Sequence, residues 1–192
     1  MADRPLLFLD VDGPLNAYGT RPEGRPAGYT PHRWTHLRSG GTPGKPSYYV
    51  RLPKVWLHPG HGARLRALPY DLVWCTSWNE LANRYIGPAV GLVGGEEQLP
   101  DLPLVPVGDA PEEDRPGGVH WKLAALLEYA AGRPFAWVDD EVTDADRAFV
   151  ADRHAAPALL RLVDPATGLT DDDFETLAAW ASHRTETEMD RS

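Results

Sequence analysis

Short apolar runs alternate with amphipathic stretches along most of the chain, which is the pattern of an α/β protein with a parallel sheet. Five runs are predicted to be strands: Leu6–Leu9, Leu72–Cys75, Leu104–Val107, Phe135–Val138 and Ala158–Val163. The first, second and fourth are apolar throughout, as expected for central strands covered on both faces. The third contains Pro106, which lacks a backbone N–H, so we place it at an edge.

Helical periodicity fills the intervals between these runs. Helices are predicted over residues 60–68, 78–86, 119–131, 143–153 and from Thr170 onward. The second is expected to stop at Gly87-Pro88, because a Gly-Pro pair commonly ends a helix. Thr170 and Asp173 have the spacing of a capping box for the last helix. The chain is therefore predicted to form a Rossmann-like parallel sheet with helices on both faces.

The segment after the first strand does not fit this alternation. Residues 15–56 are rich in Pro and Gly, and their clearest pattern is a hairpin of Trp34–Arg38 and Tyr48–Leu52 around a turn at Gly40–Gly44. Because a long structureless loop is uncommon inside a compact domain, we predict a small basic flap or cap inserted after the first strand. The chain is otherwise expected to be one domain over residues 1–184, followed by a polar tail at 185–192.

The aromatic residues Trp34, Tyr48, Tyr49 and Trp56 lie among the basic residues of this insert. They are expected to form the small core of the insert. The alternative is that they stack on a nucleobase.

Composition indicates a cytoplasmic protein. Hydrophobic residues make up 42% of the 192 residues and charged residues 24%, which is ordinary for a soluble globular chain. No apolar run is long enough to cross a bilayer, and no leader pattern precedes the first strand, so no membrane association is expected. The single cysteine, Cys75, cannot form an internal disulfide, in keeping with a reducing compartment.

Charge is spread unevenly along the chain. The segment from Arg21 to Arg66 holds nine basic residues and one acid, a net charge of +8. Because the whole chain carries −9, the remainder carries −17. A basic insert on an acidic body suggests attraction for an anionic substrate, and neutralisation of the body across an internal interface is the alternative.

Two acidic residues follow the first predicted strand directly. Asp10 and Asp12 are separated by one residue, and Gly13 permits a sharp change of direction after them. In an open α/β sheet, ligands bind at the carboxyl ends of the strands, so these carboxylates lie where chemistry is expected. Two carboxylates this close repel each other and are stabilised by a divalent cation. An acidic turn is the alternative, since Asp and Gly are common turn residues.

Three further features follow later elements in the same way. Thr76 and Ser77 come after the second run, where a hydroxyl could donate to a phosphoryl oxygen or cap the next helix. Lys122 falls in the first turn of its predicted helix, where the helix dipole disfavours a cation; a role in a site would explain that placement, and a solvated lysine is the alternative. The fourth run leads into Asp139-Asp140-Glu141, a candidate ligand cluster or a capping loop.

The order of these features resembles the haloacid dehalogenase (HAD) superfamily. Its four motifs are matched by Asp10-Val11-Asp12-Gly13, by Thr76, by Lys122 and by Asp139-Asp140, so the resemblance spans roughly residues 6–180 with the insert as a variable element. More narrowly, the stretches Asp12–Asn16, Trp74–Trp78 and Trp137–Glu141 are similar to the HAD domain of bacterial "Swiss army knife" RNA-repair proteins.

This resemblance implies a phosphohydrolase mechanism. Asp10 would attack phosphorus and form an aspartyl phosphate, while Asp12 would protonate the leaving oxygen and later activate water. Thr76 and Lys122 would hold the phosphoryl oxygens. Mg²⁺ would bind the Asp10 carboxylate, the Asp12 backbone carbonyl and the Asp139/Asp140 pair. The carboxylate of Asp12 favours phosphate esters over dehalogenation, because a halide leaving group needs no proton.

The expected substrate is a nucleotide, a nucleic-acid end or another phosphorylated metabolite. The candidate substrate-binding residues are Asn16 and Ser77 near the phosphate and Arg51 and Lys54 in the insert. A phosphomutase would use the same two aspartates, and a catalytically silent HAD-like domain that binds a phosphorylated ligand is the non-enzymatic alternative. The net charge of −9 disfavours stable binding of duplex nucleic acid.

Overall fold

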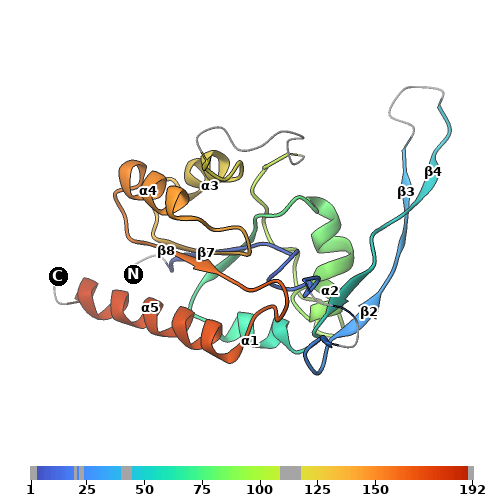
Figure 1. Ribbon diagram of the computed structural model, residues 1–192, viewed down its shortest axis with the longest axis horizontal. Coiled ribbons are helices and arrows are strands. Elements are labelled where there is room, and N and C mark those ends of the chain that lie inside the picture. The colour runs from blue at the N-terminus through green and yellow to red at the C-terminus, as the bar shows by residue number, and fades with distance from the viewer. Residues whose placement is uncertain (1–3, 20, 22–23, 40–44, 109–117, 190–192) are drawn as a thin grey trace.

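The centre of the molecule is a four-stranded parallel sheet with the strand order β6-β1-β7-β8 (Figure 1). The computed structural model describes residues 4–19, 21, 24–39, 45–108 and 118–189. The sheet strands are β1 (Leu6–Leu9), β6 (Asp71–Trp74), β7 (Phe135–Asp139) and β8 (Ala158–Leu162). The predicted α/β class and the parallel, Rossmann-like arrangement of these four runs are confirmed.

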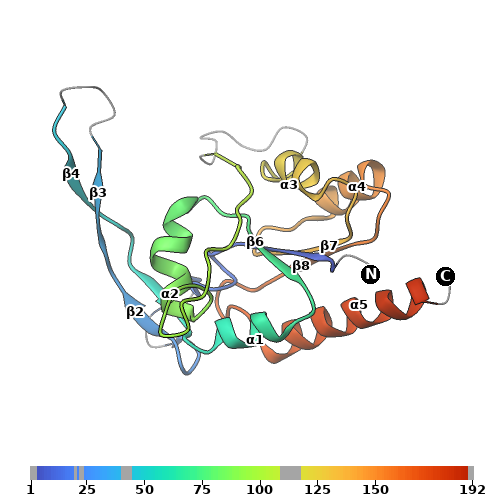
Figure 2. The same ribbon diagram turned by 180° about the vertical axis from the view of Figure 1, so that it is seen from behind.

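Helices cover both faces of this sheet (Figures 1 and 2). One face carries α3 (Leu123–Ala130) and α4 (Asp144–Arg153), and the other carries α1 (His61–Ala67) and α5 (Asp171–Met189). Successive residues of β1 belong to opposite cores: Phe8 packs in the cluster that includes Leu126, and Leu9 in the cluster that includes Leu177. Full burial of each such side chain contributes about 1.5–3 kcal/mol, so β1 is held from both sides.

The predicted Thr170–Asp173 pair lies at the start of the last helix. Both the backbone N–H and the hydroxyl of Thr170 donate to the Asp173 carboxylate, at 2.8 and 2.7 Å. The helix α5 then continues to Met189, so it includes most of residues 185–192, which we expected only as a polar tail. Among the described helices, none has both the length and the apolar character that a bilayer span requires.

The helix predicted to stop at Gly87-Pro88 does not stop there. A π-helical turn, η2 (Ala82–Ile86), continues directly into α2 (Gly87–Val90), and the chain leaves the helix only at Gly91, whose φ is +79°. Pro88 is the second residue of α2, and because it has no backbone N–H the helical hydrogen bonding of η2 cannot continue through it. The Gly-Pro pair therefore marks the change from π to α geometry.

The third apolar run forms less structure than predicted. Leu104 makes a single parallel bridge to Trp74, so this run lies beside β6 at the edge of the sheet but forms no extended strand. The edge position expected from Pro106 is confirmed.

The insert contains the predicted hairpin. It is built from β3 (Thr35–Arg38) and β4 (Tyr48–Arg51), with the antiparallel pair β2 (Thr30–His32) and β5 (Val55–Leu57) at its base. We call these two strand pairs the ribbon. It projects from the body beside η2 and α2 (Figures 1 and 2). The predicted turn at Gly40–Gly44 lies outside the described residues.

The aromatic residues of the ribbon divide into two groups. Trp34 packs against the core of the body, and Trp56 is half-buried. Tyr48 and Tyr49 remain 51% and 74% exposed. The prediction of a small aromatic core is therefore wrong for the two tyrosines, because a two-stranded ribbon has no second layer to cover it.

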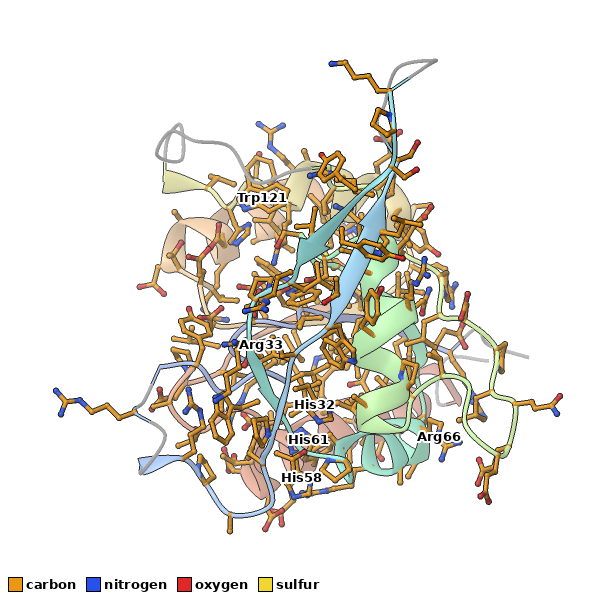
Figure 3. The ribbon with its side chains drawn as sticks, turned by 90° about the vertical axis from the view of Figure 1, so that its right-hand side faces the viewer. His32, Arg33, His58, His61, Arg66 and Trp121 are labelled. Carbon is orange, nitrogen blue, oxygen red and sulfur yellow. The ribbon has the colours of Figure 1, made fainter. Side chains whose placement is uncertain are left out.

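A buried histidine makes stability dependent on pH. His61, the first residue of α1, is 3% exposed and its ring stacks on His58 at 4.7 Å (Figure 3). Burial is the main cause that lowers the pKa of His61 from 6.5 to about 4, and His58 and Arg64 add to it. Between those two pKa values the unfolded chain binds a proton that the folded chain does not, so stability falls as the pH falls.

We therefore expect the contribution of His61 to the free energy of unfolding to decrease by up to roughly 3 kcal/mol as the pH falls from about 6.5 to about 4, seen as the difference between wild type and a variant without this imidazole. Urea unfolding across this range, on the wild type and on His61→Phe, measures the effect. The variant is expected to lose this part of the acid dependence, while His58→Phe keeps most of it, because burial is the main cause of the shift. An unchanged slope in His61→Phe would contradict the assignment.

Candidate active site

Three adjacent strands bring the predicted residues to one edge of the sheet. Asp10 follows β1, Thr76 follows β6 by two residues, and Asp139 is the last residue of β7. Leu9 is in register with Trp74 on one side and with Val138 on the other, so the three carboxyl ends are level. The sheet therefore places these side chains together, as the sequence predicts.

Lys122 connects two of the carboxylates. Its ammonium lies 2.9 Å from Asp10 Oδ2 and 2.8 Å from Asp139 Oδ2. All three side chains are buried: Asp10 is 6%, Lys122 4% and Asp139 1% exposed. Lys122 immediately precedes α3, whereas it was predicted to lie within the first turn of that helix. Its side chain is part of the site and the solvated alternative is wrong.

This cluster carries more negative than positive charge. Burial raises the pKa of Asp10 above its ordinary 3.8, the attraction of Lys122 opposes that shift, and repulsion from Asp139 adds to it. Burial alone would lower the pKa of Lys122, but the two carboxylates outweigh it and the net direction is upward. One ammonium shared by two carboxylates leaves an excess negative charge that a cation would offset.

The Thr76 side chain contacts both the acidic cluster and the turn that follows β6. It hydrogen-bonds to Asp10, which opposes the rise that burial causes in the pKa of that carboxyl. Its Oγ1 also accepts a long hydrogen bond, 3.4 Å, from the Trp78 backbone N–H at the start of the following turn. At 2% exposure, the hydroxyl faces the cluster and not open solvent.

The carboxylate of Asp12 is held on both oxygens. Asn16 Nδ2 donates to Oδ1 at 2.7 Å, and the Trp78 indole Nε1 donates to Oδ2 at 2.9 Å. Asn16 Oδ1 in turn accepts from the Trp56 backbone N–H at 2.9 Å, so the same amide connects Asp12 to the base of the ribbon. Asn16 is 5% exposed, which places it behind Asp12 as a positioning residue.

Asp140 packs against the loop that follows Asp12. A Cβ at Gly13, whose φ is +86°, would lie 2.4 Å from both Cβ and Cγ of Asp140. Tyr18 Oη donates to Asp140 Oδ2 at 2.5 Å. Burial is the main cause of a raised pKa for Asp140. Glycine is therefore required at position 13 for this carboxylate to approach.

Three carboxylates together could hold a divalent cation. One oxygen each from Asp10, Asp139 and Asp140 lies within 4.8 Å of the others. Oxygen ligands are what Mg²⁺ prefers, and their combined charge exceeds that of the one lysine. These carboxylates fit the predicted magnesium site. In that prediction the backbone carbonyl of Asp12 is a further ligand.

His120 holds the backbone of Lys122 in position. Its Nδ1 accepts from the Lys122 backbone N–H at 3.1 Å, which assigns the ring proton of the neutral imidazole to Nε2. That Nε2 lies 3.2 Å from Glu141 Oε2, and the His120 backbone N–H donates to Asp146 at 2.6 Å. These contacts fix the turn from which the lysine side chain reaches the two carboxylates.

The predicted substrate-binding residues are scattered. Ser77 is exposed and lines an opening of about 270 Å³ beside Asp12, together with Leu52, Pro53, Trp78 and Leu81. Lys54 lies over the Trp56 ring at 4.5 Å. Arg51 is exposed and pairs with Thr35 across the ribbon, on the face opposite to His36 and Val50. The structure brings Ser77 to the site and directs Arg51 away from it.

Comparison with known proteins adds no assignment. No family model, curated protein or solved structure shows a significant match to this chain. What can be said of its chemistry therefore rests on the residues and geometry described above.

Proposed function

We propose that this protein is a Mg²⁺-dependent phosphomonoester hydrolase that acts through an aspartyl phosphate on Asp10, as the resemblance to the HAD superfamily implies. The observation that supports it most is the buried bridge of Lys122 between Asp10 and Asp139 beside the Thr76 hydroxyl. A lysine in that position neutralises the charge of a nucleophile and of the carboxylate beside it.

Each residue then has a distinct task. Asp10 attacks phosphorus, the bond to the leaving oxygen breaks, and Asp12 gives that oxygen a proton. Asp12 next takes a proton from the water that attacks the aspartyl phosphate, which releases phosphate and regenerates Asp10. Thr76 and Lys122 hold the phosphoryl oxygens. Asp10, Asp139 and Asp140 would hold Mg²⁺, which supplies charge neutralisation for the incoming phosphate.

The opening beside Asp12 supports a substrate larger than phosphate alone. Its walls come from both the ribbon and the loop after β6, and most of them are apolar. We propose a nucleotide or a nucleic-acid end as the substrate class, with Asn16 positioning Asp12 and Ser77 nearest to the entering group.

The direct test is phosphate release from p-nitrophenyl phosphate and from a panel of nucleotides, oligonucleotide ends and sugar phosphates. Each compound is assayed with Mg²⁺ and with EDTA. Release that requires Mg²⁺ and leaves dephosphorylated product supports the proposal. An isomerised product with no free phosphate identifies a phosphomutase instead. Binding without turnover of any compound identifies a silent domain.

A pair of glycine variants tests whether Asp140 must approach Gly13. In Gly13→Ala the new Cβ would overlap Asp140, whereas Gly132, with a similar φ of +81°, has nothing within 4 Å of its added Cβ. Both variants are expected to lose about 1–2 kcal/mol of stability from the left-handed backbone. Gly13→Ala alone should need at least about tenfold more Mg²⁺ for half-maximal activity, because a displaced ligand weakens metal binding by that order. Equal Mg²⁺ dependence in the two variants would contradict the placement of Asp140.

A comparison of substrates with different leaving groups tests whether Trp78 positions Asp12 for proton transfer. Trp78→Phe keeps an aromatic ring but removes the N–H that holds Asp12 Oδ2. If Asp12 protonates the leaving oxygen, kcat should fall about ten- to a hundredfold for alkyl phosphates and much less for p-nitrophenyl phosphate, whose leaving group needs little protonation. Trp74→Phe, which removes an indole N–H donated to Asn83 instead, is the matched control. An equal loss with both leaving groups would show that Trp78 is only structural.

A further inference from the structure

The opening beside Asp12 continues into a larger groove beneath the ribbon. The second chamber, of about 640 Å³, shares Leu52, Ser77, Trp78 and Leu81 with the first and extends to His36 and Arg38 of β3. Binding pockets for whole ligands have volumes of about 300–1,000 Å³, so the two chambers exceed what one phosphate group requires. A substrate that fills them has to extend along the ribbon away from Asp12.

One face of the ribbon borders this groove. His36 pairs with Val50 and Arg38 with Tyr48, and side chains of such directly opposite residues lie on the same face. His36, Arg38 and Val50 line the groove, and His36 Nδ1 lies 3.2 Å from Tyr85 Oη on η2. We call this the inner face. The intervening residues Leu37 and Tyr49 lie on the outer face.

The chemistry of the ribbon is that of a surface for a polyanion with planar groups. Residues 24–57 contain six basic residues, Arg25, Arg33, Arg38, Lys45, Arg51 and Lys54, and no acid; Arg38 lies on the inner face, whereas Arg51 lies on the outer face. Tyr48 is 51% exposed next to Arg38 on the inner face. Glu80, on the opposite wall of the groove, is the acid that faces it. Exposed aromatic rings beside bases bind single-stranded nucleic acid by stacking and by phosphate neutralisation.

We propose that the inner face of the ribbon binds the end of a single-stranded nucleic acid, whose terminal phosphate lies at Asp10. This deepens the proposed function and rests on it. The terminal nucleoside occupies the chamber against Trp78 and Leu52. The next nucleotides follow the groove, with a phosphate at Arg38 and a base stacked on Tyr48. A duplex is excluded from this role because stacking on Tyr48 requires an unpaired base.

The test compares substrates of increasing length. Mononucleotides and single-stranded oligonucleotides of up to six nucleotides, as RNA and as DNA and with the phosphate at either end, are assayed for kcat/KM beside p-nitrophenyl phosphate. We expect kcat/KM to rise about tenfold or more with length for at least one of these series and to fall with added salt, because stacking and phosphate contacts accumulate. The RNA and DNA series distinguish the two sources.

Two neighbouring tyrosines provide a matched pair. Tyr48→Ala should lower kcat/KM for the preferred oligonucleotide about tenfold, since one base–aromatic stack is lost, and should leave p-nitrophenyl phosphate turnover unchanged. Tyr49→Ala, the adjacent exposed tyrosine on the outer face, should change neither. Arg38→Ala should reduce the salt dependence of binding, and Arg38→Lys should restore most of it.

Binding of labelled oligonucleotides to Asp10→Asn, followed by fluorescence anisotropy, separates this inference from the proposed activity. Affinity that depends on Tyr48 but not on Tyr49 supports the ribbon surface even if the wild type releases no phosphate, in which case the activity proposal fails alone. Phosphate release that is independent of substrate length and identical in both tyrosine variants overturns the inference. Binding of duplex and single strand with equal affinity overturns it as well.

Discussion

Replacement of Asp10 by asparagine is expected to lower phosphate release by at least two to three orders of magnitude, about what one essential polar group supplies in a catalytic site. The amide keeps the shape of the side chain but cannot form the acyl phosphate. It also removes one of the two carboxylates that hold the Lys122 ammonium at 2.9 and 2.8 Å. Initial rates with Mg²⁺ on the best compound of the panel measure the effect.

Asp71→Asn is the control for this variant, because Asp71 is an exposed aspartate at the opposite end of the sheet, paired with Arg133. It is expected to retain wild-type rates. Since Asp10→Asn relieves the repulsion between Asp10 and Asp139, its unfolding temperature should not fall greatly. Near-normal turnover by a folded Asp10→Asn protein would exclude Asp10 as the nucleophile.

Lys122→Met is expected to have the largest effect on stability. Methionine fills much of the same volume, but it leaves Asp10 and Asp139 buried side by side without their shared cation. Removing one partner of a buried ion pair costs about 3–5 kcal/mol. Because a divalent cation would replace part of the missing charge, Mg²⁺ should stabilise this variant more than it stabilises the wild type. Denaturant unfolding with Mg²⁺ and with EDTA measures both quantities.

Arg66→Met provides the comparison at the surface. Its pair with Glu97, at 2.8 Å, joins side chains that are 33% and 69% exposed, and such pairs contribute only about 0–1 kcal/mol. If Lys122→Met were no more destabilising than Arg66→Met, the ammonium would not be neutralising the two carboxylates. Activity of the Lys122→Met protein should also fall sharply, since the phosphoryl oxygens lose a cation.

The hydrophobic pattern predicted the fold where local and long-range preferences agree. β1 is apolar at four successive positions and is covered on both faces, so periodicity alone identified it. Prediction was poorer where the local conformation depends on packing against another residue of the fold. Gly87 approaches Val93 so closely that an added Cβ would lie 2.5 Å from its Cγ2, and this packing explains a glycine that the sequence suggested as a helix end.

The residues of the site also divide into those that the sequence predicted and those that it missed. Asp10, Thr76 and Asp139 follow strands directly, so a parallel sheet brings them together whatever their later neighbours are. Trp78, Tyr18 and His120 were missed as site residues because each acts across the fold on a partner at another element: Asp12, Asp140 and the Lys122 backbone. The available signal was position alone, since Trp78 and His120 lie two residues from Thr76 and Lys122. Arg51 was predicted to bind substrate because of its charge. The alternation of side chains along β4 places it on the outer face of the ribbon.

The most direct test of the central claim is to identify the residue that carries phosphate during turnover. The enzyme is mixed with its best substrate and Mg²⁺, quenched in acid within the first turnovers, and treated with borohydride, which converts an aspartyl phosphate to homoserine before peptide mass analysis. We predict homoserine at position 10, which depends on Mg²⁺ and is absent from Asp10→Asn. Phosphate release with an unmodified Asp10, or with the modification at another residue, would contradict the proposed mechanism.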